Sequence, residues 1–437
     1  MSGVWRCWQA MIATPLLLWS VAYALAAVPM QDYAMVGGLT HSQLATLLLP
    51  VVILVHWRWH RQLPWPSDET VWARVLVLLA VLLSAAFARY GWQNGVDEVR
   101  RWGLAMLVGY AVFVVPRHWN DVVLLVVVLV VAPLGAALFA LGLSGMGVGP
   151  GAFAIPGTPF MRAYGTIGQP NSFAGYLNMA WPLLAGLTLW GWQERTWWRW
   201  WPTLVLLVVV SALALTFSRG GWLGAVAGAL VLLWGVGGRW RMGVLVVVAG
   251  AVLVLAGGWR LIPAPLGPRL GSASQIVTAP ALLRDEAQQR PDVYAAVERA
   301  AQFRAGWLMW QAHPLTGVGA GNYSNAYLDV AYNGWWISRG HAHNAYMQIA
   351  AEQGLFGLAA YLWLWWAQWR RSVSAARHVV PAVRWLGIAA MSTLVAVAVH
   401  ECFEYLQVHY LPLHLAAVVA LAGVGQRLAG ADEEAHA

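Results

Sequence analysis

The chain has 437 residues, of which 60% are hydrophobic and only 10% are charged. Soluble domains are usually about 25% charged, so a soluble enzyme, a disordered chain and a secreted disulfide-rich protein are excluded. The net charge is +8 and every cation is arginine, which favours membrane lipid headgroups over nucleic acid as partners. Two cysteines near opposite ends of the chain, Cys7 and Cys402, indicate neither a disulfide framework nor a metal site. The composition therefore predicts an all-α polytopic membrane protein.

Apolar stretches long enough to cross a bilayer recur along the whole chain. A transmembrane helix needs about 20 mostly apolar residues, and irregular backbone cannot face lipid. The first stretch ends in Ala24-Leu25-Ala26, which also fits a cleaved signal peptide, but its length and the spans after it favour an uncleaved helix. We expect about twelve transmembrane helices, at roughly 9–28, 40–57, 72–88, 102–116, 121–141, 172–190, 202–217, 222–237, 243–262, 345–367, 384–400 and 407–425.

One long polar insertion separates the ninth and tenth spans. It divides the chain into helices 1–9 in residues 1–262, a large loop in residues 263–343, helices 10–12 in residues 344–425 and a tail in residues 426–437. Arginines are more frequent near the helix ends on one side, which predicts that this side and both termini are cytoplasmic. The large loop is then expected on the periplasmic side.

Within this loop, residues 292–312 have the spacing of a helix lying on the membrane surface. The helix is expected to end at His313-Pro314, before a turn-rich connection containing Gly317, Gly319 and Gly321. The side chains expected along one side of it are Val293, Val297, Ala300, Phe303, Trp307 and Trp310.

Two polar clusters lie at helix ends on the predicted periplasmic side. Arg219 sits between two apolar runs, and arginine is costly there unless it faces protein or water. It is interpreted either as an interfacial residue or as an anion ligand beside a helix N-terminus. In the second cluster, Asn171 or Ser172 can cap the next helix. Capping does not account for Arg162 and Gln169 nearby, which are candidate ligands for phosphate or sugar hydroxyls.

The long loop contributes two further candidate arginines. Arg304 lies on the predicted surface helix, and Arg339 lies just before the tenth span. Each is interpreted either as a solvated side chain or as a phosphate contact.

The run His341-Ala342-His343-Asn344 opens the tenth span. No cysteine or paired carboxylate lies nearby to complete a metal site, so no metal is expected. Histidine titrates near neutrality, which makes His343 the candidate general base, with His341 and Asn344 as supporting residues. Glu404, after the eleventh span, is expected to pair with an arginine or with His343.

Several arginines, one candidate base and no expected metal suit a substrate whose leaving group is a phosphate delivered from the lipid phase. The chain contains no P-loop, so ATP and other cofactors are not expected.

At these residues the sequence resembles the O-antigen ligase superfamily. The resemblance lies in a spaced motif in which His343-Asn344 is followed by nine residues, Gly354, two further residues and Gly357. It extends to the Ser218-Arg219-Gly220 turn and to the run from His313 to Gly319. It implies a twelve-span fold in the bacterial inner membrane with a large periplasmic loop. It also implies transfer of a glycan from undecaprenyl pyrophosphate to a hydroxyl of lipid A–core oligosaccharide, without ATP or metal. The family's essential histidine falls on His343, and its essential arginines fall on Arg219 and Arg304.

Three alternatives remain open at this point. Gly168-Gln169-Pro170-Asn171 after Arg162 resembles protein O-oligosaccharyltransferases, which modify pilin-like proteins. A transporter or flippase for polyprenyl-linked glycans would share the arginines but would not require the histidine. A cell-wall polymerase would depend on a carboxylate, and Glu404 would then be the position to test.

Overall fold

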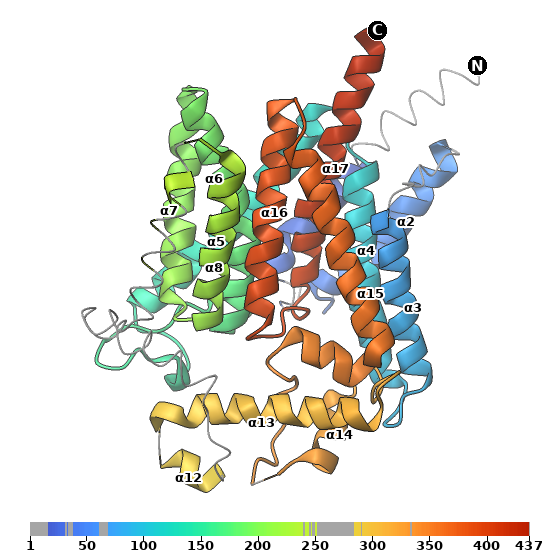
Figure 1. Cartoon of the computed structure of the whole chain (residues 1–437). Helices are drawn as coiled ribbons and strands as arrows, with labels where there is room; N and C mark the ends of the chain where they lie inside the picture. The colour runs from blue at the N-terminus through green and yellow to red at the C-terminus, as the bar shows by residue number, and fades with distance from the viewer. Residues whose placement is uncertain are drawn as a thin grey trace.

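The structure is a computed structural model that describes residues 16–30, 33, 38–60, 69–238, 241–243, 246, 250, 284–289, 291–332 and 334–436. The start of the predicted first span, nearly all of the predicted ninth span at 243–262 and the first part of the long loop lie outside these residues. The described residues form helices and connections without a β-strand (Figure 1), as the composition predicts.

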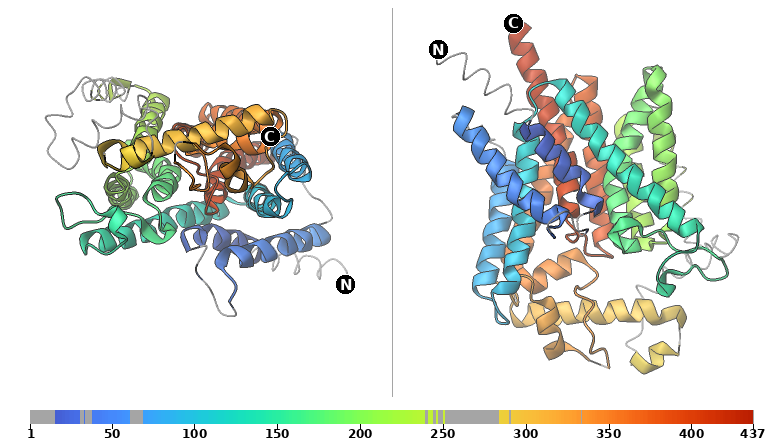
Figure 2. Two further views of the ribbon diagram at one scale, coloured as in Figure 1. Left: turned by 90° about the horizontal axis from the view of Figure 1, so that it is seen from below. Right: turned by 180° about the vertical axis from the view of Figure 1, so that it is seen from behind.

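The helices fall into a bundle and a layer across one end of it (Figures 1 and 2). The bundle contains an apolar helix at Leu16–Ala26 and α2 (His41–His60), α3 (Glu69–Ala86), α4 (Gln93–Val114), α5 (Trp119–Gly145), α6 (Pro170–Gln193), α7 (Trp200–Leu215), α8 (Arg219–Val236), α15 (Ala345–Ala376), α16 (Pro381–Glu401) and α17 (Leu411–His436). The layer contains α12 (Arg284–Gln288), α13 (Pro291–Ala312), α14 (Tyr323–Val330) and the first turns of α15.

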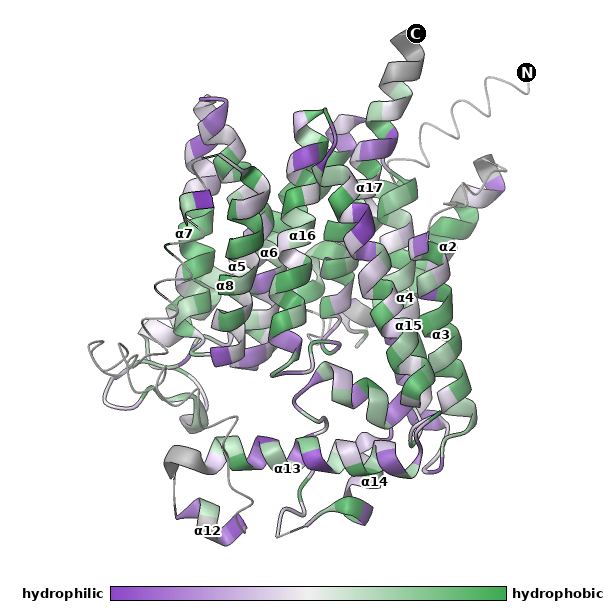
Figure 3. Ribbon diagram, in the orientation of Figure 1, coloured by the Kyte–Doolittle hydropathy of each residue, from purple (hydrophilic) through white to green (hydrophobic). Residues whose placement is uncertain are grey.

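Six helices of the described residues are long and apolar enough to cross a membrane: α3, α5, α7 with the preceding turn η4 (Trp197–Arg199), α8, α16 and the Leu411–Ala431 part of α17. Figure 3 shows that hydrophobic residues predominate along these helices and that hydrophilic residues gather towards their ends. The predicted spans at 40–57, 102–116, 172–190 and 345–367 coincide with α2, α4, α6 and α15. The chain is therefore a multi-pass helical membrane protein, while the number twelve remains a prediction.

Helix α16 lies at the centre of the bundle and contacts α6, α8, α15 and α17. Its contact with α8 depends on glycine, because a Cβ atom at Gly224 would overlap the carbonyl oxygen of Ala396. One turn later, a Cβ atom at Gly228 would come within 2.9 Å of the Ala396 side chain. Small residues at a four-residue spacing allow close approach of membrane helices, and the Ser392 hydroxyl completes the contact by donating to the Gly228 carbonyl at 2.8 Å.

The helix predicted at residues 292–312 is confirmed as α13, which lies across the end of the bundle. On the predicted apolar side Val297 is buried, whereas Phe303 and Trp307 are exposed. The residues that face inward are smaller or unbranched and include Val297, Ala301, Ala305 and Met309. The reason is close packing: a Cβ atom at Gly306, on this side, would already lie 3.0 Å from Met347 and 3.3 Å from Ala342.

The junction between layer and bundle is a bend in α15. Gly354 has φ 65°, a conformation that glycine adopts readily, and a Cβ atom there would overlap the backbone of Leu315. The loop after α13 fits into this space, where the Leu355 amide donates to the Pro314 carbonyl at 2.8 Å. The bend lets residues 345–353 run within the layer while the rest of α15 enters the bundle.

We predict that Gly224→Ala destabilises the bundle by about 1–3 kcal/mol, because the added methyl group forces α8 away from α16. Thermal unfolding of the protein in detergent measures this. Gly142→Ala in α5 is the matched control, because no atom lies within 4 Å of a Cβ there and alanine favours a helix over glycine. Equal melting temperatures for the two variants would contradict the proposed role of this contact.

Candidate functional site

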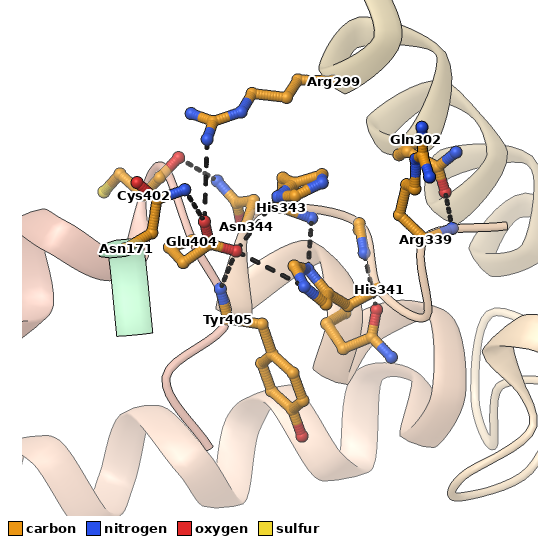
Figure 4. A network of polar contacts seen from close by, with 12 residues as sticks. Asn171, Arg299, Gln302, Arg339, His341, His343, Asn344, Cys402, Glu404 and Tyr405 are labelled. Atoms are coloured by element: carbon orange, nitrogen blue, oxygen red, sulfur yellow. Dashed lines mark hydrogen bonds and ion pairs between the residues drawn. The ribbon is translucent and has the colours of Figure 1, made fainter. Parts of the chain in front are cut away.

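The candidate site lies where the layer meets the bundle. Five segments converge there: the start of α6, the start of α8, α13, the loop before α15, and residues 402–410 between α16 and α17. Figure 4 shows labelled residues of α6, α13, the loop before α15 and the segment that carries Glu404. This convergence places most of the polar clusters expected from the sequence at one end of the molecule.

Glu404 is the centre of the polar network. Its side chain is 5% exposed, and its two carboxylate oxygens receive different partners. Oε1 lies 3.0 Å from His343 Nδ1 and 3.4 Å from His341 Nε2. Oε2 accepts a hydrogen bond from Asn171 Nδ2 at 2.8 Å and lies 3.7 Å from the Arg299 guanidinium (Figure 4). One buried anion thus connects α6, α13 and the loop before α15.

The neighbours of Glu404 determine its ionisation. Burial alone would raise the pKa of its carboxyl, but His343, His341 and Arg299 hold that pKa well below its usual value. Glu404 is therefore ionised at neutral pH and acts only as a hydrogen-bond acceptor. It follows that His343 carries a hydrogen on Nδ1, and that in its neutral form Nε2 is the atom able to accept a proton.

His343 is positioned by the residue that follows it. The Asn344 side chain caps α15 by accepting from the Met347 amide at 2.8 Å, and its Nδ2 donates to the Cys402 carbonyl at 3.0 Å. His343 itself has φ 52°, which is uncommon for a residue with a side chain. Because Asn344 ties the loop both to α15 and to the segment that carries Glu404, the imidazole is held against the carboxylate.

His341 has a defined hydrogen-bonding role beside His343. Its Nδ1 accepts the His343 amide hydrogen at 3.2 Å, so the hydrogen of the neutral ring is on Nε2 and points to Glu404. Burial lowers the pKa of His341 to about 4, although Glu404 opposes this. His341 is accordingly neutral at pH 7, with its Nε2 3.4 Å from the carboxylate of Glu404.

His341, His343 and Glu404 also form a candidate metal-ligand group, with ligand atoms within 4.8 Å of one another. Two imidazoles and one carboxylate suit zinc. The hydrogen bonding does not fit this group, because a metal at His341 Nε2 would require a hydrogen on Nδ1, where the His343 amide already donates. The arrangement fits a carboxylate that orients two imidazoles better than it fits a metal centre.

Arg162 and Asn171 form an extension of the network, as their proximity in the sequence indicates. The Arg162 guanidinium donates to the Thr216 carbonyl at 2.8 Å and to Asn171 Oδ1 at 3.2 Å. Asn171 then donates to Glu404. Gln169, the neighbouring candidate, is exposed at the N-terminal cap of α6, and its side chain does not cap the helix.

Arg219 is the first residue of α8 and is buried. Ser218 caps the helix by accepting from the Gly221 amide at 3.2 Å. Directly after Arg219, a Cβ atom at Gly220 would lie 2.9 Å from Phe403 and from the His400 ring. Arg219 therefore lies at the same end of the bundle as the segment that carries Glu404.

Arg304 and Arg339 belong to the same layer but have partners of their own. The Arg304 guanidinium lies 3.9 Å from the centre of the Tyr332 ring. Arg339 pairs with Glu298 at 2.6 Å, and its backbone amide donates to Gln302. Of the arginines on α13, it is Arg299 that lies against Glu404.

Two residues of this region, Arg299 and Asn178, were not predicted from the sequence. Arg299 lies five residues before Arg304 on one helix, and only the rotation of α13 decides which of them points to Glu404. The second is the buried amide of Asn178, which donates to the Gly221 carbonyl at 3.0 Å and lies 3.4 Å from His400 Nδ1. A polar pair inside predicted spans is a signal that could have indicated this contact.

The fold and the site thus define a class: a multi-pass helical membrane protein with a buried polar site at one end of its bundle. Residues 206–362 match the family model of O-antigen ligase. This match supports the O-antigen ligase superfamily, a family of enzymes of the O-antigen ligase and polymerase class. The matched residues include Arg219, Arg299 and His343 but not Glu404. A comparison with curated proteins found no match.

We predict that the stability of the wild-type protein falls between pH 7 and pH 5, in part through His341. Its pKa is about 4 in the folded state and about 6.5 when unfolded, so below pH 6.5 the unfolded chain binds more protons and stability is lost towards pH 4. The contribution at pH 5 is about 2 kcal/mol, from 1.36 kcal/mol per pKa unit.

Thermal unfolding at both pH values measures this effect, with His341→Asn as the comparison. The variant is expected to lose less stability than the wild-type protein over the same pH interval. An identical loss would mean that His341 is not buried as a neutral ring.

Proposed function

We propose that this protein transfers a glycan from undecaprenyl pyrophosphate to a hydroxyl of lipid A–core oligosaccharide. The observation that carries the proposal is the contact between His343 Nδ1 and the ionised Glu404 at 3.0 Å, because it directs the basic Nε2 of a neutral imidazole to the substrate. The match of residues 206–362 to the family model of O-antigen ligase supports the choice of a glycan and a lipid-linked donor.

The proposed reaction is a single displacement. His343 Nε2 takes the proton from the acceptor hydroxyl, and the oxygen forms a bond to the anomeric carbon of the donor glycan. The bond from this carbon to the phosphate oxygen breaks, and undecaprenyl pyrophosphate leaves with the electron pair. The sugar linkage is inverted, and the reaction requires neither ATP nor a metal ion.

Arginines provide the positive charge that the leaving pyrophosphate needs. Arg299 lies beside Glu404, Arg162 bonds to Asn171, and Arg219 lies at the same end of the bundle. These three arginines are assigned to the phosphate oxygens. Fixed guanidinium groups in a site with little water are effective at stabilising such charge. Arg304 and Arg339 are proposed to act further along the donor, since each already has a partner within the layer.

The proposed membrane arrangement follows from the arginine distribution. Twelve spans place both termini in the cytoplasm, and α13 with the Glu404 site on the periplasmic side of the bacterial inner membrane. The acceptor and the lipid-linked donor are then both available at the layer. Exposed Cys402, beside the site, should react with a membrane-impermeant thiol reagent added to the periplasmic side.

A protein acceptor is the second candidate. The motif Gly168-Gln169-Pro170-Asn171 that suggests it lies at the site, where Asn171 binds Glu404 directly. Purified protein with the lipid-linked glycan and either lipid A–core or a pilin separates the two, because each acceptor gives its own product on a gel. Absence of product with both would favour the transporter or the polymerase alternative.

We predict that His343→Ala lowers the rate of transfer by roughly 10²–10⁴, the usual contribution of a general base. The assay is formation of glycosylated acceptor by purified protein. His378→Ala, in the connection between α15 and α16 at the opposite end of the bundle, is the control and should leave the rate unchanged. Normal transfer by the His343 variant would exclude the base assignment.

We predict that Arg219→Lys lowers the transfer rate by roughly 10²–10³, because an ammonium group retains the charge but not the bidentate geometry that suits phosphate. Arg241→Lys is the matched control. Its guanidinium lies 4.9 Å from the centre of the Trp234 ring, after the far end of α8. If Arg219→Lys kept full activity, the site would need only positive charge at this position.

A further inference from the structure

A large apolar cavity lies at the opposite end of the bundle from the Glu404 site. Its volume is about 530 Å³, within the range typical of ligand pockets. It is lined by α5, α6, α16 and the segment that begins α7, and it is open on one side. Five of its lining residues are tryptophans at the ends of these helices: Trp119, Trp190, Trp198, Trp201 and Trp385.

The cavity extends from these tryptophans into the bundle. Gly186 of α6 and Ala389 of α16 line its inner part. Gly186 is 15 residues from Asn171 along the same helix, which corresponds to about 22 Å at 1.5 Å per residue. The cavity is thus separate from the Glu404 site. Tryptophans are typical of the level at which lipid headgroups meet hydrocarbon, so the space behind them lies at the depth of acyl chains.

Arginines stand next to the lining residues on three of the surrounding segments. Arg117 precedes α5 by two residues, Arg199 ends η4, and Arg384 lies in the first turn of α16. The Arg199 guanidinium lies 4.6 Å from the centre of the Trp192 ring. The nearby acid Asp121 accepts the backbone amides of Arg117 and His118. This end of the cavity therefore attracts an anionic headgroup.

We propose that the cavity binds one acyl chain of an anionic phospholipid, with the lipid phosphate held by Arg117, Arg199 and Arg384. The apolar lining accounts for the chain, and the arginines account for the phosphate. The lipid belongs to the leaflet opposite the Glu404 site and fills the space between α16 and the α5–α6–α7 group. It takes no part in glycan transfer.

Native mass spectrometry of the full-length protein with added phosphatidylglycerol tests the proposal. Gly186→Leu should no longer bind the lipid, because the leucine side chain fills the inner part of the cavity. A Cβ atom at this position lies 3.6 Å from Ala389, which is an ordinary van der Waals contact. Gly135→Leu in α5, where no atom lies within 4 Å of a Cβ, is the matched control and should keep the lipid. Ala382→Leu at the other end of the cavity provides a second filled variant.

The arginines have their own test. Arg384→Gln should weaken binding of phosphatidylglycerol roughly fivefold and weaken binding of phosphatidylcholine with the same acyl chains less, because the choline cation offsets the charge of its phosphate. His343→Ala should bind the lipid as the wild-type protein does, so the result is independent of the proposed transferase activity. Unchanged lipid binding by folded Gly186→Leu and Ala382→Leu would overturn the proposal, as would displacement of the lipid by undecaprenyl phosphate in a one-to-one ratio.

Discussion

The burial of one carboxylate, Glu404, is the constraint on which the site depends. An ionised carboxylate removed from water is costly unless its oxygens are paired. Here α6 supplies an amide, α13 supplies a guanidinium, and the loop before α15 supplies two imidazoles. These donors come from segments far apart in the sequence, so satisfying the charge also fixes the layer against the bundle. The same contacts leave His343 in one tautomer and one orientation.

Close backbone packing makes this convergence possible. Gly224 and Gly228 bring α8 against α16, which places Arg219 at the end of α16 near the Glu404 segment. Gly354 bends α15, which turns residues 345–353 out of the bundle and directs His343 to Glu404. The sequence signature that joins His343-Asn344 to Gly354 therefore has a physical basis: Asn344 begins the short helical segment, and Gly354 ends it at the loop after α13.

Most helices could be predicted because long apolar runs have few alternatives in a membrane. The limits of that reasoning are visible in α4 and α13. The first turns of α4 contain Glu98 and Arg101, which form a hydrogen bond with one another. Hydropathy alone therefore underestimates the length of this helix. The spacing of α13 predicts one apolar side, but it does not show which residues pack against the rest of the protein. Small residues line the inward face, and the rotation of the helix decides whether Arg299 or Arg304 contacts Glu404.

The contacts of Glu404 also separate two requirements of the proposed reaction, the orientation of the base and the positive charge for the leaving group. Asn171, His341 and His343 approach the carboxylate to 2.8–3.4 Å, whereas Arg299 remains at 3.7 Å and is 23% exposed. A pyrophosphate carries more negative charge than one carboxylate and competes for this guanidinium. If Arg299 turned to the donor phosphates, the hydrogen bonds from Asn171 and His343 and the contact with His341 would still hold Glu404, so the orientation of His343 would be kept. Positive charge is thereby available to the leaving group without disturbing the base.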